Sequence, residues 1–179
     1  MTITEVLLIG GRSGVGKSTV GYEVSARLRA ADIGHALIEG DVLDHLHPAP
    51  PGDPHRTLLT EHNLAAIWAT YAALGCRRLI YTNTAAVLAS ESGLFARALG
   101  ADLRVVRVLL TASDATARDR LAGRELGSEH AQQVRRSAFM ARRLEEQAAA
   151  GTVRVATDGR GVMEIAAEVA GVAGWAERR

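Results

Sequence analysis

The stretch "GRSGVGKST", residues 11–19, decides how this sequence is expected to fold. It contains the spacing G-x-x-x-x-G-K-[ST], in which a glycine-rich turn joins a buried strand to a helix. The motif residues are Gly11, Gly16, Lys17 and Ser18. The apolar run "TEVLLIG" (4–10) precedes the turn, and a helical pattern over 17–31 follows it. Both neighbours that the motif needs are present, so the spacing predicts a phosphate-binding turn after the first strand.

The backbone of this turn is the expected binding surface for a nucleotide. Its glycines let consecutive N–H groups point inward, and the helix that begins near Lys17 adds the positive end of its dipole. We expect Ser18 to offer its hydroxyl to Mg²⁺ and Thr19 to lie near the α-phosphate. The residues expected to contact the nucleotide are Gly11, Arg12, Ser13, Gly14, Val15, Gly16, Lys17, Ser18 and Thr19.

Lys17 is the only lysine among the twenty-one Lys and Arg residues of the chain. A compact ammonium group on a flexible stem can bridge β- and γ-phosphate oxygens inside a narrow loop, where a planar guanidinium would be too wide. The single lysine therefore indicates a chemical requirement. The alternative is a chance glycine-rich turn between a strand and a helix.

Composition limits the classes of protein to which the chain can belong. With 179 residues, 47% of them apolar, we expect one domain over 1–179. A net charge of +1 argues against a nucleic-acid partner. A single cysteine, Cys76, and the lack of a long apolar run predict a cytoplasmic protein that is not embedded in a membrane. We expect a monomer or a homodimer.

Apolar runs alternate with helical patterns, which is typical of an α/β fold with a parallel sheet and helices on both faces. The expected strands are residues 4–10, 34–40, 77–83, 103–110 and 152–157. The expected helices are residues 17–31, 57–75, 86–99, 114–125, 129–149 and 161–176. The segment 47–55 contains all four prolines and is predicted to be an irregular surface loop.

The second strand leads into "LIEGDVLDHLHP", which places Asp41 at the carboxyl edge of the sheet beside the glycine-rich turn. A carboxylate there can accept the proton of an attacking hydroxyl or hold Mg²⁺ through water. The alternative is that Asp41 or Asp44 caps the helix that follows.

The two motifs "GRSGVGKST" and "EGDVLDHLHP" together resemble the small P-loop kinases of the nucleoside-monophosphate-kinase-like group. Within this group the chain is similar to gluconate kinase, adenylylsulfate kinase, chloramphenicol phosphotransferase and tunicamycin resistance proteins. The resemblance implies a three-layer P-loop NTPase fold with a small lid, and it implies ATP and Mg²⁺ as cofactors. It also implies that Asp41 lies at the hydroxyl of the acceptor.

The resemblance further implies a lid over about 118–137, whose arginines fold over the phosphates. Arg120 and Arg124 are four residues apart and share a helix face, and Arg135 and Arg136 follow. The alternative for these arginines is a helix held by salt bridges. By position, Asp158 would border the adenine ring, although an Asp-Gly turn into the last helix explains it equally well.

The third strand, "RRLIYTNTA", ends without the aspartate that many P-loop ATPases place there for Mg²⁺. This argues against a motor or an AAA-type protein and makes Thr82 and Asn83 candidates for contacting the acceptor. The histidines of residues 35–62 match no zinc spacing, so we expect His47 or His62 to contact the acceptor and not to bind a metal ion.

These observations predict an enzyme that transfers the γ-phosphoryl group of Mg·ATP to a hydroxyl of a small molecule, either a metabolite or an antibiotic. Lys17, Asp41, Arg120 and Arg124 are the expected catalytic residues. The alternative from another class is a regulatory nucleotide-binding switch that hydrolyses ATP slowly and acts through a protein partner.

Overall fold

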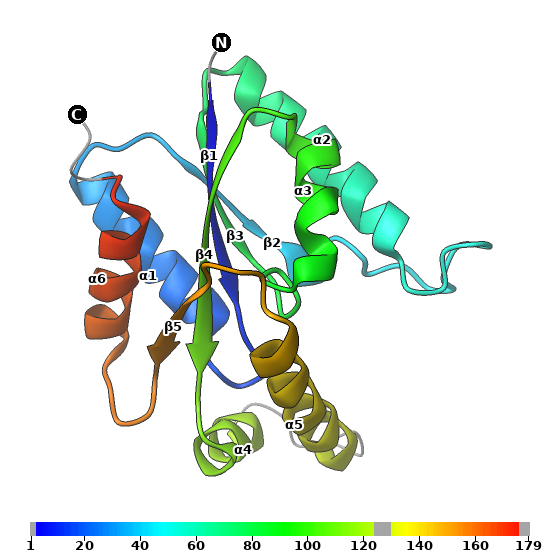
Figure 1. The fold of residues 1–179 in the computed structure, drawn as a ribbon, viewed down its shortest axis with the longest axis vertical. Coiled ribbons are helices and arrows are strands. Elements are labelled where there is room, and N and C mark those ends of the chain that lie inside the picture. The colour runs from blue at the N-terminus through cyan, green and yellow to red at the C-terminus, as the bar shows by residue number, and fades with distance from the viewer. Residues whose placement is uncertain (1–2, 124–129, 176–179) are drawn as a thin grey trace.

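The computed structural model describes residues 3–123 and 130–175. Its centre is a parallel sheet of five strands in the order β2-β3-β1-β4-β5 (Figure 1). The strands are β1 (Thr4–Gly10), β2 (Ala36–Glu39), β3 (Arg78–Thr82), β4 (Leu103–Thr111) and β5 (Val153–Ala156). This confirms the predicted α/β fold with a parallel five-stranded sheet.

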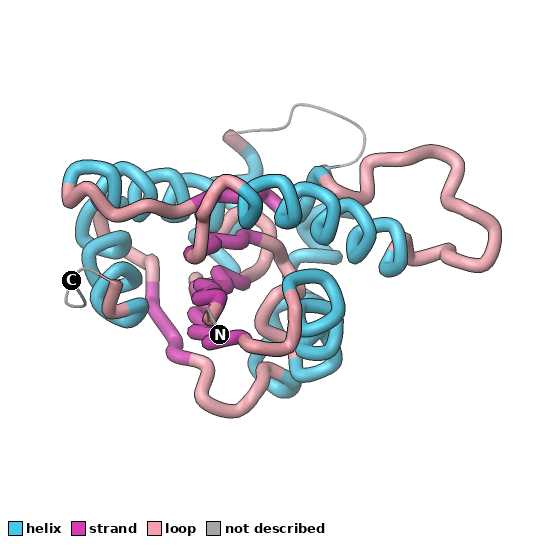
Figure 2. The backbone as a smooth tube through the Cα atoms, turned by 90° about the horizontal axis from the view of Figure 1, so that it is seen from above, coloured by secondary structure: helices cyan, strands magenta, loops and turns pink. Residues whose placement is uncertain are grey.

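Helices follow the strands and cover both faces of the sheet (Figure 2). They are α1 (Lys17–Ala30), α2 (Thr57–Ala73), α3 (Ser92–Leu99), α4 (Asp114–Ala122), α5 (His130–Gln147) and α6 (Val162–Ala173). Two short 3-10 helices, η1 (Gly40–Val42) and η2 (Ala89–Glu91), follow β2 and precede α3. No helix of the described ranges is long and apolar enough to cross a membrane.

The central strand β1 shows why the sheet forms from continuous apolar runs. It pairs with β3 on one side and with β4 on the other, and its last five residues are buried. Because successive side chains of a strand point to opposite faces, Val6 and Leu8 belong to one core cluster, and Leu7 and Ile9 belong to another. A strand covered on both faces therefore needs apolar residues at every position.

The two core clusters divide the helices into layers. One cluster joins the sheet to α2, α3 and α5 through residues such as Trp68 and Phe95, and the other joins it to α1 and α6 through residues such as Val24 and Val169. Helices α4 and α5 lie beyond the carboxyl end of β4, where ligands of open α/β sheets bind (Figure 1).

The helix expected over 86–99 is shorter than predicted, since α3 begins at Ser92. Ala86, Val87 and Leu88 are buried without forming an α-helix. The carbonyl of Val87 accepts a hydrogen bond from the Ala149 N–H at 2.8 Å, and a Cβ on Gly10 would lie 2.7 Å from the Val87 side chain. This segment therefore packs across the end of β1, and its apolar residues fill the core as a loop.

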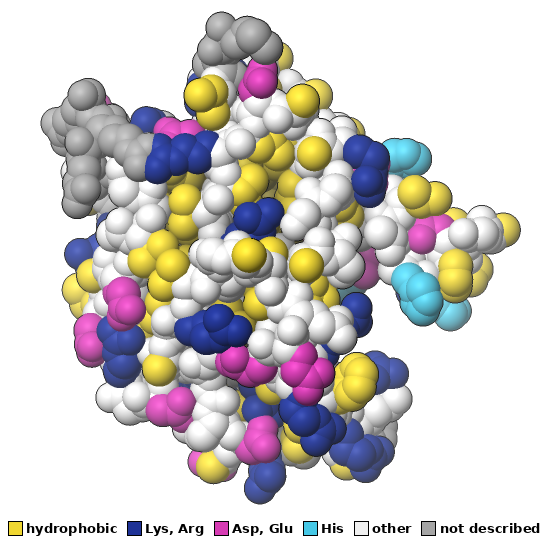
Figure 3. Space-filling view, viewed as in Figure 1, with side chains coloured by type: hydrophobic (Ala, Val, Ile, Leu, Met, Phe, Trp, Pro, Cys, Tyr) yellow, Lys and Arg dark blue, Asp and Glu magenta, His cyan; other side chains and the backbone are white. Residues whose placement is uncertain are grey.

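The proline-rich segment 47–55 forms a loop that projects from the body of the molecule, as predicted (Figure 1). The buried carboxylate of Asp53 accepts hydrogen bonds from the N–H groups of Thr57, at 2.8 Å, and Leu59, at 3.0 Å. These bonds satisfy donors at the N-terminus of α2, so Asp53 anchors the loop to the helix that follows. Figure 3 shows histidines on and beside this projecting loop.

Candidate active site

The turn between β1 and α1 has the backbone shape that its glycines predict. Gly14 has a φ of 84° and Gly16 a φ of 100°, in the left-handed region that favours glycine. A Cβ on Gly14 would also lie 2.7 Å from the carbonyl oxygen of Ala117 in α4. Helix α1 begins at Lys17 with no side-chain cap and no acidic residue in its first turn, so its N–H groups and dipole remain available to an anion.

Lys17 lines a cavity of about 470 Å³ at the carboxyl edge of the sheet, which we call the phosphate cavity. Its side chain is 8% exposed, and its Nζ donates to the carbonyl of Arg12 at 3.4 Å. The same Nζ lies 4.0 Å from Oδ2 of Asp41. The phosphate cavity is lined by the glycine-rich turn together with Lys17, Ser18, Asp41, His45, Gln133 and Arg136.

Asp41 is oriented by groups at the end of β3. Its Oδ1 accepts hydrogen bonds from Nδ2 of Asn83 at 2.8 Å and from the Thr84 N–H at 3.4 Å. The carboxylate remains 54% exposed, so it is held in place and still accessible from the cavity. Asp41 is the second residue of η1, and its side chain bonds to the end of β3 instead of capping a helix.

The glycine before Asp41 has a steric role that only the tertiary structure shows. A Cβ on Gly40 would lie 2.2 Å from the hydroxyl oxygen of Tyr81 and 2.9 Å from Cβ of Asn83. Tyr81 is buried and packs edge-to-face on Phe95, with ring centroids 5.3 Å apart. Gly40 thus lets η1 pass close to β3, which brings Asp41 within reach of Asn83.

A second cavity of about 450 Å³, which we call the acceptor cavity, lies next to the first. Asn83 lines the acceptor cavity and bonds to Asp41, which lines the phosphate cavity. The other polar residues of its wall are Asp44, His55, Thr57, Thr60, Tyr81, Glu91 and Arg143. Burial, and then the negative charges of Asp41, Asp44 and Glu91, raise the pKa of the Tyr81 phenol above its usual value.

The structure places some candidates for acceptor contact elsewhere. Thr82 is buried, and its methyl group would lie 2.7 Å from a Cβ on Gly21 in α1, so it faces away from the acceptor cavity. His47 and His62 are exposed and do not line the acceptor cavity, whereas His55 does. Sequence reasoning did not find His55, because nothing in the pattern shows that this end of the projecting loop borders the cavity.

The side chain of Arg12 bonds to residues of α4 and α5. It is 4% exposed, its Nε donates to Oγ of Ser137 at 2.8 Å, and its guanidinium pairs with Asp114 at the start of α4. Hydrogen bonding and charge from Arg12 lower the pKa of Asp114. The Ser137 hydroxyl in turn donates to the carbonyl of Ser13 at 2.9 Å. Arg12 and Ser137 therefore attach α4 and α5 to the phosphate-binding turn, and a nucleotide would meet the backbone of Arg12.

Arg120 lies beside a different part of the turn from the phosphate cavity. Its guanidinium donates to the Val15 carbonyl at 3.2 Å and to Oγ1 and the carbonyl of Thr157 at 3.0 and 3.1 Å. Arg120, Thr19 and Arg160 line a third cavity of about 340 Å³. Arg120 also bonds to Thr157, next to Asp158, where the resemblance to the small P-loop kinases places adenine. Its expected role at the phosphates stays a prediction, and Arg124 lies outside the described residues.

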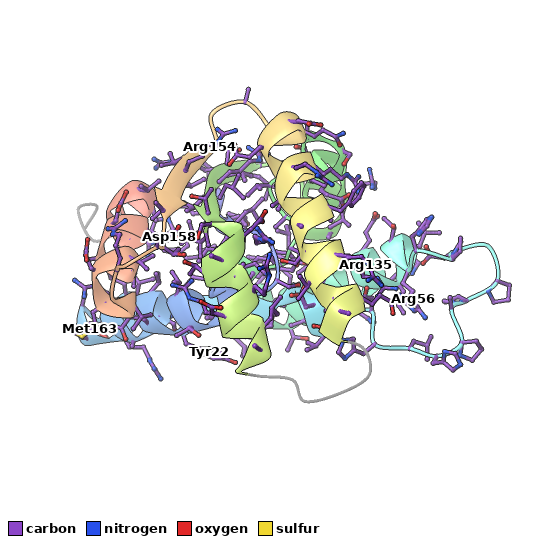
Figure 4. All side chains as sticks on the ribbon, turned by 90° about the horizontal axis from the view of Figure 1, so that it is seen from below. Tyr22, Arg56, Arg135, Arg154, Asp158 and Met163 are labelled. Carbon is purple, nitrogen blue, oxygen red and sulfur yellow. The ribbon has the colours of Figure 1, made fainter. Side chains whose placement is uncertain are left out.

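Arg136 of α5, instead of Arg120, lines the phosphate cavity with Lys17. Gln133 and Arg136 are three residues apart and Arg143 follows seven residues later, so they share one face of α5. This spacing was a signal in the sequence, but only the packing of α5 decides which face turns toward the site. Figure 4 shows α4 and α5 side by side at this end of the molecule.

Asp158 holds the N-terminus of α4. Its carboxylate accepts from the Ser113 N–H at 3.1 Å and lies 2.7 Å from Oγ of Ser113, which caps the helix at Thr116 (Figure 4). Hydrogen bonds from Thr116 and Ser113 lower the pKa of Asp158 to about 2. The carboxylate is thus engaged with α4, and its expected contact with adenine stays a prediction.

The oxygen atoms of two side chains in the phosphate cavity are suitable ligands for Mg²⁺. The hydroxyl of Ser18 and the carboxylate of Asp41 line the same cavity, and hard oxygen ligands are those that Mg²⁺ prefers. Within the described ranges, no group of three or more His, Cys, Asp or Glu side chains could hold a metal ion. Ser18 and Asp41 could therefore hold Mg²⁺ together with phosphate and water.

The fold of the chain resembles those of several solved structures. The structure resembles a gluconokinase from Sinorhizobium meliloti, with 19% sequence identity, a TM-score of 0.61, and coverage of 97% of this chain and 94% of that one. It resembles the Deinococcus radiodurans tunicamycin resistance protein, with 24% identity, a TM-score of 0.61 and 96% of both chains covered. It also resembles the Mycobacterium tuberculosis APS kinase in complex with AMPPNP and APS, with 22% identity, a TM-score of 0.55, and coverage of 96% and 98%.

No curated protein matches the chain significantly in sequence. A family model described as "AAA domain" matches residues 6–158. The absence of an aspartate at the end of the third strand argued against an AAA-type protein. For family membership this expectation is wrong, because the AAA-domain model matches the chain. Because the match spans most of the chain, the chain belongs to the AAA domain family and has the fold of the small P-loop kinases.

Proposed function

We propose that the protein transfers the γ-phosphoryl group of Mg·ATP to a hydroxyl group of a small molecule. The observation that carries the proposal is the hydrogen bond between Asp41 and Asn83, which joins the phosphate cavity to the acceptor cavity. An acceptor hydroxyl at this junction would meet both the carboxylate and the phosphoryl group that it attacks.

The residues around the junction have complementary roles in this reaction. Lys17 and Arg136 neutralise charge on the phosphates, and the N–H groups of the turn cradle them. Ser18 would hold Mg²⁺, which would supply further positive charge to the phosphates. Asp41, positioned by Asn83, orients the acceptor hydroxyl and accepts its proton.

Phosphoryl transfer needs no reactant other than ATP and the acceptor. The acceptor oxygen forms a bond to the γ-phosphorus, the bond from that phosphorus to the bridging oxygen breaks, and ADP leaves with the electron pair. The proton of the hydroxyl passes to a carboxylate oxygen of Asp41 and from there to water. Because Asp41 is half exposed, it can release this proton directly.

A regulatory switch that hydrolyses ATP slowly is the second candidate, because apolar side chains are exposed on both sides of the projecting loop. Val42 is 55% exposed, Leu46 48% and Leu58 55%. A protein partner could cover them. The acceptor cavity favours the phosphotransferase, since a switch does not need a second polar pocket next to the phosphates.

The test is transfer from Mg·ATP into a pooled panel of metabolites and hydroxylated antibiotics, read by mass spectrometry. We expect a product that gains one phosphate with the intact protein and none with Lys17→Ala. Tight ATP binding with no such product, and hydrolysis that a protein partner stimulates, would instead support the switch.

A further inference from the structure

The acceptor cavity contains two carboxylates from different elements. Asp44 follows η1, Glu91 is the last residue of η2, and both are partly buried. Among residues 3–123 and 130–175, the Asp44 carboxylate has neither a hydrogen bond nor an ion pair, and that of Glu91 has only a 3.5 Å contact with Oγ of Ser90. Both side chains line the acceptor cavity, so a ligand in that cavity would meet carboxylate oxygens that these described contacts leave accessible.

Charge is distributed unequally between the two neighbouring cavities. The phosphate cavity has Lys17 and Arg136, as phosphate requires. The described wall of the acceptor cavity has two carboxylates and one arginine, Arg143, whose Nε donates to Gln147 at 3.3 Å. Asp41 adds a third carboxylate at the junction. Burial is the main reason that the pKa of Tyr81 is raised, and the negative charges of these three carboxylates raise it further.

We propose that the acceptor carries a cationic amino group as well as the hydroxyl that is phosphorylated, and that Asp44 and Glu91 bind this ammonium group. This inference rests on the proposed phosphotransferase function and names its substrate class, a hydroxylated amine such as an amino sugar or amino alcohol. An ammonium group has three N–H donors and satisfies two carboxylates at once. Arg143 and His55 are left to bind neutral oxygens of the acceptor.

An acidic acceptor fits the same cavity poorly. A carboxylate or phosphate that reached Arg143 would also approach Asp44 and Glu91, and like charges in a partly buried site repel each other. The two carboxylates therefore select against sugar acids as well as in favour of amines.

The test uses hydroxylated compounds in matched forms that differ in charge. Glucosamine, N-acetylglucosamine and gluconate form one set, and serinol, N-acetylserinol and glycerate form the other. We expect Lys17-dependent transfer with the highest kcat/KM for the amine of a set. The preference for the amine is the ratio of its kcat/KM to that of the N-acetyl form. In Asp44→Asn and in Glu91→Gln this ratio should fall about tenfold, because each substitution removes one charge-assisted hydrogen bond.

Asp102→Asn is the matched control, because it makes the same change at an exposed position next to the start of β4. It should keep the ratio of the intact protein. Binding of the same compounds to the protein loaded with Mg·AMP-PNP, measured by calorimetry, gives the charge preference independently of turnover, and we expect the amine to bind most tightly.

The outcomes separate this inference from the proposed function. Lys17-dependent transfer with a preference for the acid or the neutral form would overturn the inference and leave the phosphotransferase intact. A loaded protein that binds the amine no better than the other forms would overturn it as well. Failure of any Lys17-dependent transfer in the full pooled panel would count against the phosphotransferase itself.

Discussion

Gly40→Ala should destabilise the protein, because the new methyl group would enter space that Tyr81 occupies. The added Cβ would lie 2.2 Å from the hydroxyl oxygen and 2.3 Å from Cζ of Tyr81, whereas an ordinary contact is at least 3.4 Å. The ring must therefore move by about 1 Å, although it is buried and packed on Phe95. Overpacking of this kind costs about 1–3 kcal/mol.

Thermal unfolding followed by circular dichroism measures this cost. For a chain of this size, each kcal/mol lowers Tm by about 2–4 °C, so Gly40→Ala should lower Tm by roughly 2–12 °C. Gly34→Ala is the matched control, because its Cβ would have no heavy atom within 4 Å. The reasoning is refuted if the two variants unfold at the same temperature.

Double variants identify the atoms responsible. Combining Gly40→Ala with Tyr81→Leu removes both the hydroxyl and Cζ, so the two substitutions should be less destabilising together than the sum of their separate effects. Combining it with Tyr81→Phe removes the hydroxyl but leaves Cζ at 2.3 Å, so little rescue is expected. Equal rescue by both substitutions would show that the clash is not with the ring.

Three further predictions concern the site and its supports. Asp41→Asn should leave ATP affinity largely unchanged and lower the rate of transfer by at least about a hundredfold, as expected for a general base; full transfer activity would rule out its base role. Ser137→Ala removes the hydroxyl between Arg12 and Ser13, so amide exchange in α5 should accelerate while that of α2 does not, and unchanged exchange in α5 would contradict its role. Because folding lowers the pKa of Asp158 to about 2, its stabilisation is present above its unfolded pKa near 4 and is lost as the pH falls toward 2. The Tm difference between the intact protein and Asp158→Asn should therefore shrink from pH 5 to pH 2, and a constant difference would show that the carboxylate charge is not responsible.

Much of the fold could be predicted because its signals are local. The spacing of Gly11, Gly16 and Lys17 requires a turn between a strand and a helix, and the structure has β1 and α1 in those places. Alternating apolar runs located all five strands, since a parallel strand buried on both faces needs apolar residues throughout. The segment 86–91 was misjudged because burial as a loop and burial as a helix produce similar apolar runs.

The candidate site was predicted less completely, because its contacts join residues far apart in the chain. Arg12 bonds to Ser137, 125 residues away, and Arg120 bonds to Thr157, 37 residues away. No local pattern distinguishes an arginine that will meet phosphate from one that will meet a protein carbonyl. The choice depends on how each helix is rotated when it packs against the sheet.

The sequence by itself determined the phosphate-binding turn, the order of strands and helices along the chain, and the position of Asp41 after the second strand. Only the tertiary structure decided that Asn83 holds Asp41, that Arg136 and not Arg120 lines the phosphate cavity, and that carboxylates gather in the acceptor cavity. The reason is physical: backbone geometry and hydrophobic periodicity act between near neighbours, whereas a binding site forms where distant segments pack together.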